Sequence, residues 1–72
     1  MDMRRIVGTN VRKARLAAGL TQEQLAERSG FSQQYLSGLE QGRRNPTIVS
    51  IYELAAALGV SHVDLVSGGS GE

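Results

Sequence analysis

Apolar residues recur along the chain at the three- and four-residue spacing of amphipathic helices, in five stretches that are mostly separated by glycine. No stretch alternates apolar and polar residues as a half-buried strand would, so the pattern predicts an all-α fold. The expected helices span roughly residues 3–18, 22–29, 33–41, 48–58 and 62–66. Their expected core positions are Val7, Val11, Ala14, Ala18, Leu25, Ala26, Leu36, Leu39, Ile48, Ile51, Leu54, Ala55 and Leu58.

Start and stop signals for helices support these boundaries. A glycine follows each of the first four stretches, where a left-handed residue ends many helices. Thr21 and Gln24 have the spacing of a capping box, in which each side chain bonds the backbone N–H of the other residue. The further expected caps are Ser32, Thr47, and Ser61 with Asp64.

The length of 72 residues corresponds to one domain. We assign residues 1–66 to this domain and residues 67–72, a Gly/Ser-rich stretch, to a flexible tail. The tail is native, the start of a linker, or an addition made at cloning, and the sequence does not separate these origins. A core this small is marginal, so dimerisation is expected.

Composition excludes several classes of function. The chain has no cysteine and one histidine, His62, so neither a disulfide framework nor a protein-held metal site is expected, and no cofactor motif is present. Its longest apolar run, residues 54–58, is far shorter than the roughly 20 residues of a membrane span. No signal-peptide pattern follows the charged start, so we expect a cytoplasmic protein, and no arrangement of residues suggests an enzyme.

The segment from residue 22 to 41 carries the strongest functional signal. Two short helices are joined by only Gly30, Phe31 and Ser32, which forces them to cross steeply, as in a helix-turn-helix. Ala26 is small enough to let the helices approach, and Gly30 permits the turn. The residues expected to bury the joint are Leu25, Phe31, Leu36 and Leu39.

The net charge of +1 conceals an asymmetry. Residues 1–20 hold five basic residues and one acidic residue, whereas residues 21–42 hold one basic and three acidic residues. Arg43 and Arg44 then form a basic loop. Such separation of charge is more informative about a polyanionic partner than the total.

Four segments resemble the Cro/C1-type (Xre-like, lambda-repressor-like) helix-turn-helix family: LTQEQLAERSG at 20–30, SQQYLSGLEQG at 32–42, RRNPT at 43–47 and LAAALGVS at 54–61. The resemblance covers about residues 5–66. It implies a five-helix DNA-binding domain in which the second helix of the motif enters the major groove of double-stranded DNA. The implied function is sequence-specific transcriptional regulation, by a repressor that reads a pseudo-palindromic operator as a homodimer in a bacterial or phage system.

The resemblance also assigns roles to individual residues. Glutamine can pair with adenine in the major groove, so the expected base-reading residues are Gln33 and Gln34, followed by Ser37 and Tyr35. The expected phosphate-binding residues are Gln22, Arg43, Arg44, Asn45 and Arg12, with Lys13 as a further candidate. The amide of Gln22 can also brace Gln33.

Further residues have expected structural roles. In similar proteins an arginine at the position of Arg15 pairs with the glutamate that is Glu40 here, so we expect this ion pair. Many relatives carry a long polar side chain at the position of Gly38, so this protein either lacks that contact or uses the bare backbone for close approach to DNA. Val63 and Val66 of the last helix are the expected dimer contacts, whereas Leu65 completes the core.

The alternative class is a protein-interaction module with the same fold, such as an antitoxin-like or co-regulator adaptor. Such a module would expose an apolar face on the helix at 33–41. The polar side chains of Gln33, Gln34 and Ser37 argue against it.

Overall fold

The computed structural model describes residues 2–68, and every regular element in that range is helical. The helices are α1 (Met3–Ala17), α2 (Gln22–Ser29), α3 (Gln33–Glu40), α4 (Ile48–Leu58) and α5 (His62–Val66). The predicted five-helix, all-α fold is confirmed, and the predicted boundaries differ only at Ala18 and Gln41, which are C-caps rather than helical residues. No described helix has the length and apolar content needed to cross a membrane.

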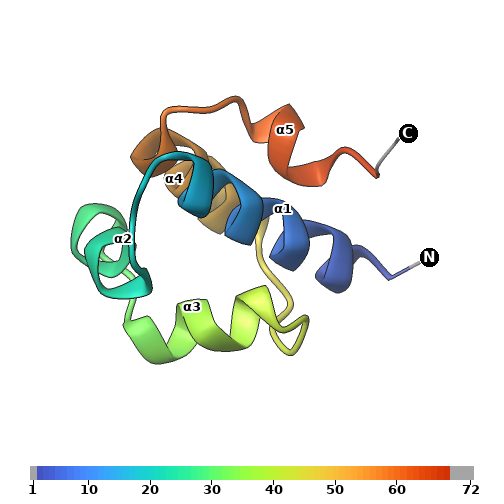
Figure 1. Ribbon diagram of the computed structural model, residues 1–72. Helices are drawn as coiled ribbons and strands as arrows, with labels where there is room; N and C mark the ends of the chain where they lie inside the picture. Colours follow the sequence, from blue (N-terminus) through green and yellow to red (C-terminus); the bar gives the residue numbers. More distant parts are fainter. Residues whose placement is uncertain (1, 69–72) are drawn as a thin grey trace.

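The first helix lies in the middle of the molecule (Figure 1). It packs against α3 on one side and α5 on the other, and α4 contacts α1, α2 and α5. The helix α2 packs on α3 and α4, and the short connection between α2 and α3 gives the expected steep crossing. The start of α3 is therefore carried at the edge of the molecule, with its far end held under α1.

The core consists of leucine and valine side chains from all five helices. Its fully buried members are Val7, Val11, Leu25, Leu36, Leu39, Leu54 and Leu65. Two of the predicted core positions differ. Ile48, the first residue of α4, is 73% exposed, and Ala18 is exposed at the C-cap of α1. Other predicted positions are partly buried and pack against the core: Ala14, Ala26, Phe31 and Ile51.

All the predicted N-terminal caps are present. Thr21 Oγ1 accepts from the Gln24 N–H at 3.1 Å, and Gln24 Oε1 accepts from the Thr21 N–H at 2.9 Å, which completes the capping box. Ser61 and Asp64 form a second capping box at the start of α5. Each cap stabilises its helix by about 1 kcal/mol, so these short helices are fixed at their first turns by local sequence.

A close contact between α1 and the end of α3 depends on Gly8, which the sequence analysis does not single out. Gly8 is buried, and a Cβ atom added to it would overlap the Leu39 carbonyl oxygen and lie 3.2 Å from the carbonyl carbon of Glu40. The backbone of α3 thus rests directly on the backbone of α1. Only glycine allows this approach.

Asn10 of α1 joins the end of α5 to the rest of the domain. Its Nδ2 donates to the carbonyl oxygens of Leu65 and Ser67, each at 3.0 Å, which satisfies acceptors that the helix end leaves unpaired. Ser67, which the sequence analysis assigned to the flexible tail, also donates its hydroxyl to the Val63 carbonyl at 2.7 Å. Ser67 is thus hydrogen-bonded to α1 and α5, and residues 69–72 of the predicted tail lie outside the described residues.

Substituting Gly8→Ala should destabilise the protein, although alanine favours a helix more than glycine does. Overpacking costs about 1–3 kcal/mol, and here the added methyl group meets backbone that cannot rotate away. We expect a lower midpoint in urea or thermal unfolding followed by circular dichroism. Thr9→Ala, at the neighbouring exposed position, is the control and should leave the midpoint nearly unchanged. An unchanged midpoint for Gly8→Ala would contradict the close contact.

Candidate nucleic-acid interface

One hollow in the surface gathers most of the residues predicted to contact DNA. It lies over α3, the start of α2 and the loop that follows α3. Its lining, which we call the polar face, consists of Gln22, Gln33, Gln34, Ser37, Gly38, Gln41, Arg43 and Arg44. The polar face contains two arginines and no acidic residue, so its charge is positive and its other side chains are hydrogen-bonding groups.

The first turn of α3 presents two amide side chains to solvent. Ser32 caps the helix by accepting from the Tyr35 N–H at 3.0 Å, and Gln33 and Gln34 follow directly and are exposed. Tyr35, which follows them, is half-buried instead. Its ring stacks on Phe31 with the centroids 5.0 Å apart and packs against the core. Of these three residues, the two glutamines are therefore the exposed ones, and Tyr35 packs inwards.

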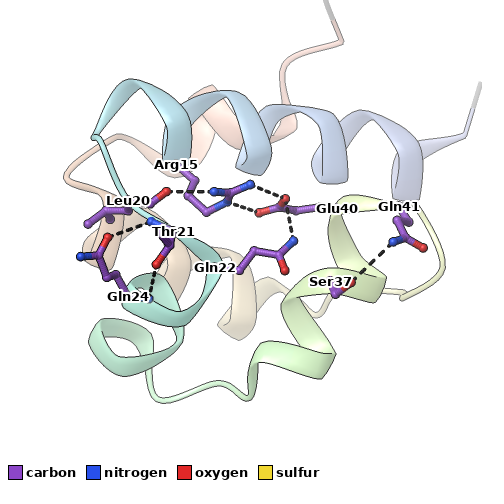
Figure 2. Close-up of polar contacts among 8 residues, drawn as sticks. All are labelled: Arg15, Leu20, Thr21, Gln22, Gln24, Ser37, Glu40 and Gln41. Atoms are coloured by element: carbon purple, nitrogen blue, oxygen red, sulfur yellow. Dashed lines mark hydrogen bonds and ion pairs between the residues drawn. The ribbon is translucent and has the colours of Figure 1, made fainter.

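A buried ion pair fixes the other end of α3, as the family resemblance implied. The Arg15 Nε lies 2.7 Å from Glu40 Oε2, and the Arg15 Nη2 donates to Glu40 Oε1 at 3.0 Å (Figure 2). The side chains are only 10% and 3% exposed. The hydrogen bond to Glu40 raises the pKa of the Arg15 guanidinium above its ordinary value, against the opposing effect of burial. Arg15 also donates to the Leu20 carbonyl at 2.8 Å, so it holds the turn between α1 and α2 as well.

Gln22 joins this network rather than bracing Gln33. Its Nε2 donates to Glu40 Oε1 at 3.1 Å, and Figure 2 shows its side chain reaching from α2 towards Glu40. The prediction that Gln22 braces Gln33 is therefore wrong about the partner. The physical reason is that the crossing of α2 and α3 brings Gln22 to Glu40, whose carboxylate accepts a hydrogen bond more strongly than a neutral amide does. Gln22 still lines the polar face, with its orientation set by Glu40.

Gln41 is a member of the polar face that the sequence analysis missed. Its Nε2 donates to Ser37 Oγ at 3.5 Å, from the position four residues along (Figure 2). This spacing places two residues on the same side of a helix, so the signal was present in the sequence. Gln41 is exposed and extends the row of hydrogen-bonding groups from α3 into the following loop.

Other predicted site residues lie outside the polar face. Asn45 is exposed in the loop and Arg12 is exposed on α1, and neither lines the hollow. On α5, Val63 is 52% exposed, whereas Val66 is partly buried against the core. Of the two predicted dimer contacts, only Val63 is thus mainly available to a partner, because most of Val66 is used inside the domain.

Comparison with known proteins agrees with this geometry. A helix-turn-helix family model matches residues 11–65. The chain belongs to the helix-turn-helix family. The family resemblance inferred from the sequence is thereby confirmed.

A sequence relative and two solved structures are similar to this chain over most of its length. An uncharacterised HTH-type transcriptional regulator of Sinorhizobium fredii, y4dJ, is 66% identical over 67 residues, which are 93% of this chain and 87% of the relative. The hypothetical transcription factor NHTF from Neisseria superposes with a TM-score of 0.88 at 36% identity, over 93% of this chain and 77% of that one. The restriction-modification controller protein C.AhdI from Aeromonas hydrophila superposes with a TM-score of 0.82 at 40% identity, over 86% of this chain and 94% of that one.

Within this helix-turn-helix domain, Arg15→Ala should be strongly destabilising. It leaves the Glu40 carboxylate buried without its charged partner, and breaking a buried pair in this way costs about 3–5 kcal/mol. We expect a large fall in the unfolding midpoint, measured by circular dichroism, whereas Lys13→Ala, at an exposed position of the same helix, should have little effect.

A double variant separates loss of the pair from loss of packing. Arg15→Met combined with Glu40→Leu removes both charges and keeps apolar volume, so it should recover much of the stability lost by Arg15→Ala alone. If the double variant is no more stable than the single one, the cost does not come from the unpaired carboxylate.

Proposed function

We propose that the protein is a transcriptional regulator that binds double-stranded DNA sequence-specifically through the polar face and acts as a repressor by occupying its operator. The observation that carries this proposal is the exposed pair Gln33 and Gln34, at the start of the second helix of a helix-turn-helix motif. Membership of the helix-turn-helix family supports the same function. The proposed location is the cytoplasm of a bacterium, for a protein of bacterial or phage origin.

Base reading is assigned to the first two turns of α3. In helix-turn-helix proteins the start of this helix meets the base edges of the major groove. The amides of Gln33 and Gln34 offer a donor and an acceptor each, which matches N6 and N7 of adenine. Ser37, one turn further along the polar face, adds a hydroxyl group.

Phosphate binding is assigned to groups that surround α3. Gln22 stands at the start of α2, where the free backbone N–H groups of a helix favour an anion. Arg43, Arg44 and Asn45 in the loop, with Arg12 on α1, supply charge and donors on the flanks. Contacts to phosphate position a protein on the duplex without reading its sequence.

The alternative, a protein-interaction module, is less well supported. It requires an apolar exposed surface on α3, and the exposed residues of this helix are instead Gln33 and Gln34. The large exposed apolar residues in the described range belong to α1, α4 and α5. The polar face therefore fits a nucleic acid better than an apolar protein surface.

Selection of bound duplexes from a randomised pool, followed by affinity measurements, tests this function. Gln33→Ala or Gln34→Ala should relax the preference at one or two base pairs of each half-site, by about 1–3 kcal/mol per position. Arg43→Ala should instead weaken binding to all duplexes alike. It should also reduce the magnitude of the slope of log K against log salt concentration by about 1. If the unaltered protein enriches no sequence from the pool, specific regulation is wrong.

A homodimer is proposed from the apolar edge formed by α4 and α5. Val63 is 52% exposed. The exposed Tyr52 lies beside His62, the residue before Val63, with the two ring centroids 4.3 Å apart. Val49, one turn before Tyr52 on α4, is 65% exposed. Pairing two copies along this edge covers apolar surface that a monomer leaves in water. A two-fold dimer would place its α3 helices about 34 Å apart, on successive turns of a pseudo-palindromic site.

Val63→Glu should convert the dimer to a monomer, because it places a charge in an apolar interface. The expected result is half the mass by sedimentation equilibrium, unchanged helical content by circular dichroism, and weaker binding to the selected duplex. Leu16→Glu is a matched control, since Leu16 is an equally exposed apolar residue on α1, at 53%. Persistence of the dimer in Val63→Glu would remove α5 from the interface.

A further inference from the structure

A glycine in the interior of α3 leaves a space that the side chain of Arg44 occupies. Gly38 has no positive φ, so the backbone there does not require glycine. A Cβ added to it would lie 3.2 Å from both Cγ and Nε of Arg44 and 3.7 Å from its Cδ. The stem of Arg44 therefore lies across the helix where another residue would carry its own side chain.

The loop after α3 returns the chain to this point. The N–H of Gly42, at φ 77°, donates to the Leu39 carbonyl at 3.0 Å, and the N–H of Arg43 donates to the Gly38 carbonyl at 2.9 Å. These two bonds form a Schellman motif, which turns the chain sharply at a helix end. Because backbone bonds fix the turn, the chain returns beside α3, and the exposed side chain of Arg44 reaches Gly38 from there.

An aromatic ring supports the other end of Arg44. The Arg44 Cζ atom lies 5.8 Å from the ring centroid of Tyr35, within the range of a cation–π contact. Tyr35 precedes Gly38 by three residues, so the two share one side of α3. The ring is itself held by its stack on Phe31 and by the core. The guanidinium thus has a fixed support on the helix that carries Gln34 and Ser37.

We propose that Gly38 and Tyr35 form a seat for Arg44, and that Arg44 reads a guanine base from this seat rather than serving only as a phosphate clamp. This inference rests on the proposed function, in which α3 enters the major groove. A side chain that lies across α3 enters the groove with it, where a guanidinium pairs with O6 and N7 of guanine. Arg44 in this way supplies from the loop the long polar side chain that Gly38 lacks, and Gly38 and Tyr35 act as positioning residues.

The experiment measures base preference rather than affinity alone. The probe is the duplex that the unaltered protein selects from a randomised pool, together with the set of its single-base-pair variants. Arg44→Lys keeps the charge but lacks the planar fork, so it should lose discrimination at one G·C pair of each half-site by about 5- to 100-fold. Arg43→Lys, the matched control, should change the affinity for every duplex by the same factor.

The positioning role of the seat is tested by Gly38→Ala and Tyr35→Leu. Gly38→Ala should raise the unfolding midpoint, since alanine favours a helix, yet lower discrimination at the same base pair, because its Cβ displaces Arg44. Tyr35→Leu should lower discrimination there as well. In the Arg44→Lys background both substitutions should cause no further loss at that pair, which a general steric or folding effect would not produce.

Two results would overturn the proposal. If Arg44→Lys weakens every duplex equally, Arg44 is a phosphate clamp; if Gly38→Ala keeps full discrimination, there is no seat. Both results leave the proposed function intact. That function fails separately, when the unaltered protein selects no sequence at all.

Discussion

The position of α3 depends on one buried ion pair, between Arg15 in α1 and Glu40 at the end of α3. Because Arg15 also binds the Leu20 carbonyl and Glu40 also accepts the Gln22 amide, two side chains hold α1, α2 and their turn against the end of α3. A pivot of α3 would separate the pair and leave a buried charge, which costs several kcal/mol. The pair therefore defines an orientation for α3, and its exposed first turn follows that orientation.

The same pair changes how the charge of the chain is interpreted. Residues 21–42 have an excess of acidic residues, but the side chain of Glu40 is only 3% exposed and is neutralised by Arg15. Glu23 and Glu27 line a different hollow, beside α2 and the turn that follows it. The polar face is left with Arg43 and Arg44 and with no carboxylate of its own. A protein with a net charge of +1 can thus present a positive surface to a polyanion.

Local sequence predicts the helices well because their end signals act over three or four residues, as the Thr21–Gln24 capping box shows. Contacts between distant residues are less predictable from a single sequence. The amide of Gln22 is chemically able to bind either Gln33 or Glu40, and the choice depends on how α2 and α3 cross. Periodicity likewise marks Ile48 as part of the apolar stripe of α4 but does not show that this first residue of the helix is exposed.

Two helical glycines show why propensity alone gives an incomplete account. Helix propensity alone makes each glycine about 1 kcal/mol less stabilising than alanine, yet the atoms around the two residues differ. At Gly8 the missing methyl group admits the rigid backbone of α3, so glycine there contributes to stability. At Gly38 the three nearest atoms all belong to the exposed side chain of Arg44, so helix propensity alone would favour alanine. A glycine that helix propensity disfavours, on the surface proposed to meet DNA, is best explained by a requirement of binding.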